Sequence, residues 1–241
     1  KALGIIVGPT GVGKSMFLIQ IAAEALINGL SVAYLTLELP TKSVKRRLYA
    51  NLLNMTIEES RHDPAEANRR RDYIEKKIAP FEVCYKTAHA TTTADVSRWL
   101  KERERDAGFK PKVIIVDMGD HLVSRVNSQQ PSYEEMRVVY GDLRSLAVER
   151  DGWVWTCSHV KGGNDGKKRI HADQLSDSQH KSRTADLILS VNATDEDKTD
   201  NMVRFSVPKR RNDESNGDVG PLPRDDARGR IVCIQRRLPW G

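Results

Sequence analysis

Residues 8–15 read Gly-Pro-Thr-Gly-Val-Gly-Lys-Ser, which is the spacing of a Walker A loop. Glycines at these positions let successive backbone N–H groups wrap around phosphates, and a helix that begins behind the loop adds the positive end of its dipole. Lys14 would reach the β- and γ-phosphates, and the Ser15 hydroxyl would bind Mg²⁺. We therefore predict a site for ATP and Mg²⁺ formed by Gly8, Pro9, Thr10, Gly11, Val12, Gly13, Lys14 and Ser15.

An acidic residue at the end of an apolar run fits the same chemistry. Residues 113–116 read Val-Ile-Ile-Val and are followed by Asp117. A carboxylate at the C-terminal edge of a buried strand, next to a P-loop, can hold the water shell of the metal ion. Asp117 is thus predicted to be the Walker B residue and to share Mg²⁺ with Ser15.

Hydrolysis also needs a group that orients or deprotonates the attacking water. Two carboxylates are candidates for this general base: Glu38, which follows the second apolar run, and Asp120, just past Asp117. Spacing alone does not choose between them.

The elements that must position these residues alternate along the first two thirds of the chain. Apolar runs typical of strands occupy 2–8, 31–37, 81–85, 113–116 and 153–158. Helical patterns occupy 14–28, 41–53 with Thr41 as its cap, 57–78, 95–105 and 133–149. Apolar strands without polar alternation, separated by amphipathic helices, indicate a parallel sheet covered on both faces. The predicted fold class is α/β, with one domain over 1–241.

The final third of the chain differs in character. Residues 161–176 are Gly-rich, basic and aperiodic, which predicts a mobile loop. Short strands are predicted at 187–191, 203–207 and 230–235, and the turn-rich segments between the later ones favour antiparallel pairing.

Composition narrows the class of protein. The net charge of +6 and the pI near 9.2 suggest a polyanionic partner, although the run Arg69-Arg70-Arg71 lies among acidic residues and reads as a solvated helix face. Cys84, Cys157 and Cys233 lie far apart in apolar runs, so we interpret them as reduced core residues. No stretch approaches the ~18 apolar residues of a membrane span and the start of the chain does not resemble a signal peptide, which predicts a soluble, intracellular protein.

Residues 32–40, Val-Ala-Tyr-Leu-Thr-Leu-Glu-Leu-Pro, resemble the strand-two signature of DnaB-type hexameric helicases. The resemblance implies that Glu38 is the general base. In that family a later strand ends in a residue that senses the γ-phosphate, and the matching strand here ends in Ser158-His159. His159 is therefore the expected sensor.

Two further segments resemble the family. Residues 175–181 and 185–189 match its DNA-binding region, but Ser176 and Gln179 replace the usual arginine and glycine. Residues 207–212 match a late Lys-x-Arg stretch that reaches into the neighbouring subunit's ATP, which implies that Arg211 is the arginine finger and Lys209 its companion, with Arg210 as an alternative finger. The DNA-phosphate contacts expected in this region are Lys161, Lys167, Lys168, Arg169 and Lys181.

The resemblance runs through nearly the whole chain and implies a RecA-like, Mg-dependent ATPase core. By this resemblance the protein forms a hexameric ring that translocates on single-stranded DNA in the bacterial cytoplasm or a phage-infected host, with a primase and a helicase loader as partners. The family's N-terminal domain and linker helix are missing, and the chain enters a strand almost at Lys1, so we expect a fragment. Two alternatives stay open: a RecA/RadA-like recombinase, and a clock-protein-like ring ATPase that binds no DNA.

Overall fold

The computed structural model describes residues 1–124, 133–160, 181, 183–211 and 217–231. The described strands form one sheet in the order β3-β2-β4-β5-β1-β6-β7-β8-β9. Their bounds in chain order are β1 (Ala2–Gly8), β2 (Val32–Thr36), β3 (Phe81–Tyr85), β4 (Val113–Asp117), β5 (Trp153–His159), β6 (Leu187–Asn192), β7 (Met202–Arg210), β8 (Asp218–Asp225) and β9 (Arg230–Ile231).

The sheet is parallel from β3 to β6 and antiparallel from β6 to β9, as predicted for the two parts of the chain. Strand β1 lies between β5 and β6, with Gly8 opposite His159 and Val7 opposite Ser158 and Ser190. Strands β2 and β4 are neighbours, with Thr36 opposite Asp117. The carboxyl ends of β1, β2, β4 and β5 therefore meet at one edge of the sheet, where α/β proteins place their ligands.

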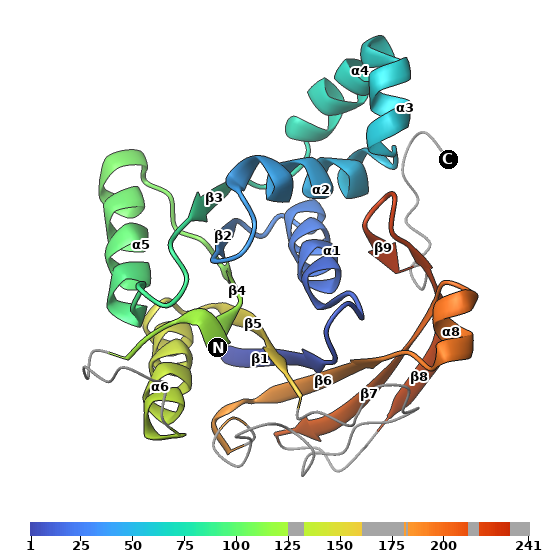
Figure 1. Ribbon diagram of the computed structural model, residues 1–241. Helices are drawn as coiled ribbons and strands as arrows, with labels where there is room; N and C mark the ends of the chain where they lie inside the picture. The colour runs from blue at the N-terminus through green and yellow to red at the C-terminus, as the bar shows by residue number, and fades with distance from the viewer. Residues whose placement is uncertain (125–132, 161–180, 182, 212–216, 232–241) are drawn as a thin grey trace.

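Helices cover both faces of the parallel part (Figure 1). On one face lie α1 (Lys14–Ile27) and α2 (Thr41–Leu53), and α3 (Ile57–His62) and α4 (Pro64–Glu75) extend beyond α2. On the other face lie α5 (Thr93–Ala107) and α6 (Tyr133–Glu149). The short helix α8 (Asp195–Thr199) joins β6 to β7.

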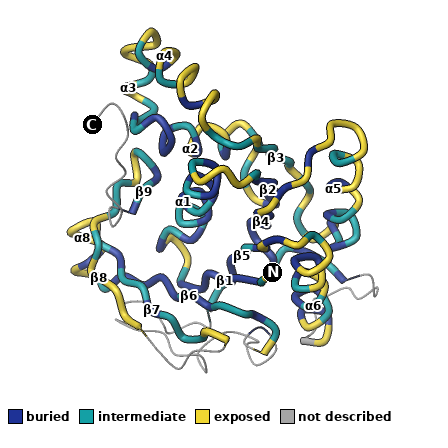
Figure 2. The backbone as a smooth tube through the Cα atoms, turned by 180° about the vertical axis from the view of Figure 1, so that it is seen from behind, coloured by how far each residue is buried: buried dark blue, intermediate teal, exposed yellow. Residues whose placement is uncertain are grey.

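Alternation along the strands builds two cores. In β4, Val113 and Ile115 face the cluster under α1 and α2, whereas Ile114 and Val116 face the cluster under α5 and α6. Successive side chains of a strand point to opposite faces, so a strand covered on both sides must be apolar throughout. Figure 2 shows buried residues concentrated in the central strands and exposed ones along the outer sides of α3, α4 and α5.

The predicted α/β class and most element bounds are confirmed, with two differences in the helices. The helix predicted over 57–78 is broken, because the Asp63 side chain accepts a hydrogen bond from the Glu66 N–H and Pro64 starts a new helix. Proline has no N–H to donate and is tolerated in the first turn of a helix. Thr41, predicted as a cap, is the first residue of α2, and Pro40 occupies the cap position without a side-chain bond.

Three elements were not predicted from the sequence: α8, β8 and the one-turn helix η1 (Gly119–His121). Helix α8 is short and polar, and Thr194 caps it. Strand β8 contains Pro221 and Pro223, which made its segment look like a turn. A strand tolerates proline where its N–H is not needed in the ladder.

The cysteine interpretation holds for Cys157, which is free and buried. Cys84 is free but only half-buried, and Cys233 lies outside the described residues. Among the described helices, none has the length and apolar character required to cross a bilayer.

Candidate nucleotide-binding site

The loop of residues 8–15 connects β1 to α1 at the carboxyl edge of the sheet. Gly11 and Gly13 have φ values of +78° and +102°, a region that side chains other than glycine rarely adopt. Gly8 packs so closely on β6 that an added Cβ would lie 2.5 Å from the Val191 carbonyl oxygen. Glycine is thus favoured at these positions, because they need a positive φ or a close approach of two backbones.

Lys14 is the first residue of α1 and is buried, with 7% of its surface exposed. Its Nζ donates to the carbonyl oxygens of Gly8 at 2.9 Å and Pro9 at 2.8 Å. Burial lowers the pKa of Lys14, and neighbouring acidic groups, Glu38 among them, oppose that shift. The ammonium is held by weak carbonyl acceptors, which phosphate oxygens can replace with stronger charge-assisted bonds.

Asp117 ends β4 directly beside the start of α1. Its Oδ1 accepts a hydrogen bond from Ser15 Oγ at 3.1 Å and lies 3.3 Å from Cys157 Sγ, while Oδ2 accepts from Tyr34 OH at 2.8 Å. A hydroxyl and a carboxylate side by side are the hard oxygen donors that Mg²⁺ prefers. Ser15 and Asp117 therefore fit the predicted metal site.

The two candidate bases occupy different surroundings. Glu38 lines the cavity next to the loop, with its side chain 38% exposed and its Oε1 3.7 Å from His121 Nδ1. Asp120 is surrounded by four donors, Tyr140 OH, Ser158 Oγ, the His159 N–H and Lys181 Nζ, and does not line this cavity. A carboxylate so fully bonded has no free position for a water, so the geometry favours Glu38.

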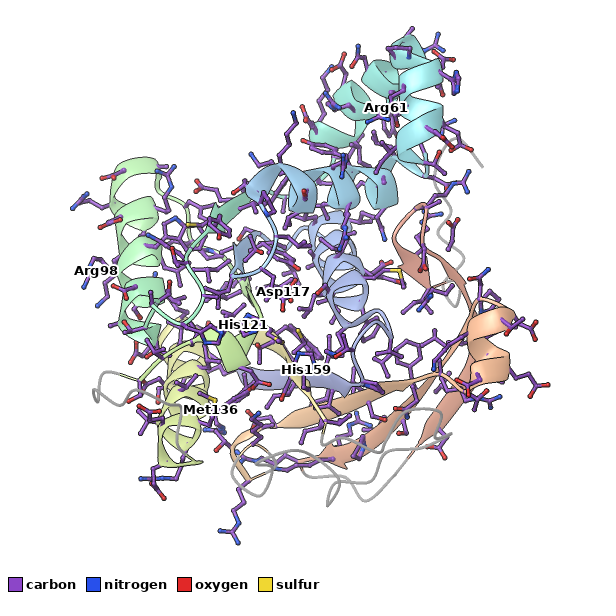
Figure 3. All side chains as sticks on the ribbon, viewed as in Figure 1. Arg61, Arg98, Asp117, His121, Met136 and His159 are labelled. Atoms are coloured by element: carbon purple, nitrogen blue, oxygen red, sulfur yellow. The ribbon has the colours of Figure 1, made fainter. Side chains whose placement is uncertain are left out.

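His159 ends β5 on the far side of the loop. Its Nδ1 lies 3.4 Å from Lys14 Nζ and 3.5 Å from Thr10 Oγ1. Burial, together with the charge of Lys14, lowers the pKa of His159 below 6.5. The imidazole is therefore neutral near pH 7. In Figure 3, Asp117 and His159 lie near the middle of the molecule beside the P-loop, whereas Arg61 and Arg98 lie on distant helices.

Lys14, Ser15, Glu38 and His159 line a cavity of about 440 Å³. The sequence analysis missed the part of its wall formed by α2 and the β8–β9 hairpin, which contributes Arg47, Arg224, Asp226 and Gly229. Arg224 donates to the Val12 carbonyl oxygen at 3.3 Å and lies 2.8 Å from Asp226. No motif marks Arg224, because only the pairing of β8 with β7 brings it to the loop.

Buried amide side chains fasten this hairpin to α1 and α2. Gln20 exchanges two hydrogen bonds with the Ile231 backbone, at 2.7 and 3.2 Å, and Asn51 donates to the Gly229 carbonyl oxygen at 2.6 Å. Such satisfied buried bonds fix the hairpin in one position. The wall of the cavity is therefore preformed.

Lys209 and Arg211 lie elsewhere and do not line this cavity. Lys209 Nζ donates to the Ala185 carbonyl oxygen at 2.7 Å, and Arg211 Nη1 lies 2.8 Å from Asp186 Oδ1. Both contact the segment before β6. Arg210 follows Lys209 in β7, so its side chain points to the opposite face of the sheet from that of Lys209.

Of the five residues predicted to contact DNA, only Lys181 lies within the described part of the chain. Lys161, Lys167, Lys168 and Arg169 lie outside the described residues. Lys181 is 4% exposed and its Nζ lies 2.7 Å from Asp120 Oδ1. An internal ion pair thus takes the place of the predicted contact between Lys181 and DNA phosphate, because a buried ammonium needs a carboxylate partner.

The fold and the site define a P-loop nucleotide-binding domain of the RecA-like class. Residues 1–165 match the model of a family described as an AAA domain. The chain belongs to this AAA-domain family.

Comparison with individual proteins narrows the relationship. The chain is homologous to a DnaB-like replicative helicase of Enterobacteria phage T4, with 28% identity over 203 residues that cover 80% of this chain and 42% of that protein. The chain thus spans less than half the length of this relative.

Two solved structures share the fold. The structure titled "ATPase Domain of G40P" has a TM-score of 0.80 at 18% identity and covers 97% of this chain and 85% of that one. A second, titled as a DnaB-like replicative helicase and its interactions with primase, has a TM-score of 0.77 at 19% identity and covers 96% of this chain and 57% of that one.

Proposed function

We propose that residues 1–241 form one motor domain of a DnaB-like replicative helicase, which hydrolyses ATP and moves along single-stranded DNA to unwind duplex at the replication fork. The observation that carries the proposal is the arrangement of Lys14, Ser15, Glu38 and His159 around one cavity, with Asp117 bonded to Ser15 behind its wall. The homology to a phage helicase supports the same function. Such a protein works in the bacterial cytoplasm or a phage-infected host.

Lys14, Glu38 and His159 each have a separate role in the hydrolysis of ATP. Lys14 exchanges its two carbonyl partners for the β- and γ-phosphates and neutralises charge there. Glu38 orients a water toward the γ-phosphorus and accepts its proton as the bond between the γ-phosphorus and the bridging oxygen to ADP breaks. Neutral His159 can donate one hydrogen bond to the γ-phosphate and so register its loss.

Ser15 and Asp117 would hold Mg²⁺, which when bound supplies positive charge beside the β- and γ-phosphates. The Ser15 hydroxyl and the Asp117 carboxylate are already in contact, so little rearrangement of either side chain is needed. A preorganised site of this kind loses less entropy on binding.

Arg211 and Lys209 complete the site of a neighbouring subunit. They lie outside the cavity of their own chain, which supports action across an interface. A residue that acts only on a neighbour requires a head-to-tail assembly, and a closing rotation gives a ring. We propose a homo-hexamer, with a primase and a helicase loader as partners of the full-length protein.

Two other functions remain as alternatives. A RecA/RadA-like recombinase would form open filaments and pair homologous strands, and a clock-protein-like ring ATPase would hydrolyse ATP without a response to DNA. The homology to a DnaB-like helicase favours the first proposal.

The test is the rate of ATP hydrolysis with and without single-stranded DNA, measured across protein concentration. We expect strong stimulation by DNA that rises cooperatively with concentration and disappears in Glu38→Gln. Glu58→Gln is the matched control, because Glu58 is exposed in the first turn of α3, away from the cavity. A rate of hydrolysis that does not change with DNA would favour the clock-protein-like ring ATPase. Pairing of homologous strands would favour the recombinase.

A further inference from the structure

A buried polar cluster lies beside the end of β5, where His159 lines the cavity. At its centre is Asp120, which follows β4 in the short helix η1 (Gly119–His121). Its Oδ2 accepts hydrogen bonds from Ser158 Oγ at 2.8 Å and from the His159 backbone N–H at 3.1 Å. Its Oδ1 accepts from Tyr140 OH at 2.6 Å. One carboxylate therefore joins the end of β4 to the end of β5 and to α6.

Lys181 provides the positive charge of this cluster. Its Nζ lies 2.7 Å from Asp120 Oδ1, 2.9 Å from Ser158 Oγ and 5.0 Å from the centre of the Tyr140 ring. The ammonium is thus surrounded by two acceptors and an aromatic face, a geometry in which its charge is well compensated.

The charge of Lys181 decides the state of Asp120. Burial alone would raise the pKa of Asp120, but the charge of Lys181 and the hydrogen bonds from Lys181, Tyr140 and Ser158 outweigh it and lower that pKa. Asp120 is therefore ionised and can accept all four bonds. Without the lysine, a buried carboxylate would have to take up a proton or admit water.

The hydrogen bond from the His159 N–H to Asp120 Oδ2 connects this cluster to the cavity. It fixes the backbone at the last residue of β5, from which the His159 imidazole reaches Lys14 and Thr10. A displacement of this backbone would move the imidazole relative to the phosphates, and hydrogen bonds weaken steeply with misalignment. Lys181 does not itself line the cavity.

We propose that Lys181 is a positioning residue of the ATP site: through Asp120 it holds His159 where it can discriminate ATP from ADP. The inference rests on the proposed function, because it assigns the γ-phosphate contact to His159. It also replaces the role in DNA binding that the sequence analysis predicted for Lys181.

The affinity for ATPγS and the affinity for ADP should respond differently to the loss of Lys181, whereas a general loss of structure would lower both. ATPγS and ADP share the contacts of the P-loop, and only ATPγS reaches His159. In Lys181→Met we expect the affinity for ATPγS to fall about tenfold, the value of one hydrogen bond to a charged group. The affinity for ADP is expected to stay unchanged.

The experiment is calorimetric titration of the full chain with ATPγS and with ADP in the presence of Mg²⁺. Because Lys181→Met leaves Asp120 buried without its partner and can prevent folding, the neutral double variant Asp120→Asn/Lys181→Met is measured beside it. Lys181→Arg should restore part of the discrimination. Lys112→Met, which removes an exposed lysine paired with Asp151, is the control.

A double-mutant cycle with His159→Ala tests the route of the effect. If Lys181 acts through His159, Lys181→Met adds nothing to the loss caused by His159→Ala. Additive losses, equal losses of ATPγS and ADP affinity, or full discrimination in the neutral double variant would each overturn the inference. Wild-type protein that binds neither nucleotide would instead refute the proposed function.

Discussion

Ser15 Oγ donates a 3.1 Å hydrogen bond to Asp117 Oδ1, so the two predicted magnesium ligands are in direct contact although 102 positions separate them in the chain. Helix α1 begins at Lys14, and β4 ends at Asp117. The contact arises because parallel strands end at one edge of the sheet, and the loop after β1 crosses that edge.

Replacing this carboxylate by an amide should separate metal-dependent chemistry from folding. In Asp117→Asn the amide oxygen still accepts from Tyr34 OH, so the packing is retained. Loss of the charge should weaken the hold on Mg²⁺ and lower the Mg-dependent rate of ATP hydrolysis by about 10²–10³-fold, the usual effect of removing one preorganised electrostatic group from an active site. The measurement is turnover against Mg²⁺ concentration.

Asp106→Asn is the matched control for that variant, since Asp106 is exposed in the last turn of α5 and pairs with Arg105. An Asp117→Asn protein with wild-type turnover and wild-type dependence on Mg²⁺ would remove Asp117 from the metal site.

Arg224 should matter for nucleotide affinity more than for turnover. It supports the P-loop from outside by its bond to the Val12 carbonyl oxygen, and it does not touch Glu38 or Asp117 in any described contact. In Arg224→Ala we expect KM for ATP to rise about 3–10-fold, the worth of one net hydrogen bond, with little change in kcat. Steady-state kinetics would measure both parameters.

The control here is Arg105→Ala, which removes an exposed arginine of α5. A fall in kcat at constant KM would show instead that Arg224 acts on the transition state.

Local sequence signals were sufficient for the central sheet and the P-loop. Glycine at positions 11 and 13 and the apolar run before Asp117 each have a direct structural cause in backbone sterics or burial. Lys181 could not be assigned in this way. Charge and loop context suggested a DNA contact, but its surroundings are set by Asp120 and Tyr140, which only the tertiary fold brings near.

The β8–β9 hairpin shows a different limit. Prolines in β8 conceal the strand, and Arg224 becomes part of the cavity wall only because the antiparallel strands curve back toward α1. The choice between Glu38 and Asp120 was likewise open in the sequence, since both follow strands that end at the same edge. Burial and hydrogen bonding distinguish them, and neither can be read from spacing.

The proposed action of Arg211 across an interface predicts complementation between two inactive proteins. Arg211→Ala retains an intact P-loop, and Lys14→Ala retains an intact Arg211. Each protein alone should bind DNA but hydrolyse ATP very slowly. In an equal mixture about one interface in four would combine the two intact halves, so activity should partly return.

Arg210→Ala tests the neighbouring candidate for the finger. Severe loss in Arg210→Ala with normal turnover in Arg211→Ala would transfer the role to Arg210. A mixture without recovery, under conditions where wild-type subunits are shown to exchange, would argue that both groups act within one chain.

We expect the stability of the fold to depend on pH through Asp197, at the turn between β6 and β7. Asp197 in α8 accepts two hydrogen bonds from Arg204, at 2.7 and 3.0 Å, and one from the backbone N–H of the cap residue Thr194 at 2.8 Å. The Arg204 hydrogen bonds are the main cause that lowers the pKa of Asp197 from 3.8 to about 2, with the bonds from Thr194 adding to the effect. The folded state therefore favours the ionised carboxylate more than the unfolded state does.

A carboxyl whose pKa is lower in the folded state stabilises the fold fully above its unfolded pKa, and that contribution is lost as pH falls through its folded value. Asp197→Asn should accordingly lower the free energy of unfolding by about 1–2 kcal/mol at pH 7, and the difference from wild type should shrink between about pH 4 and pH 2. Urea denaturation at pH 7 and pH 3 measures both values.

Asp195→Asn is the control, because Asp195 lies in the same helix but is exposed and pairs only with Lys198 among the described contacts of its carboxylate. A difference between Asp197→Asn and wild type that is the same at pH 7 and pH 3 would mean that the amide disturbs packing and that the ion pair with Arg204 contributes little.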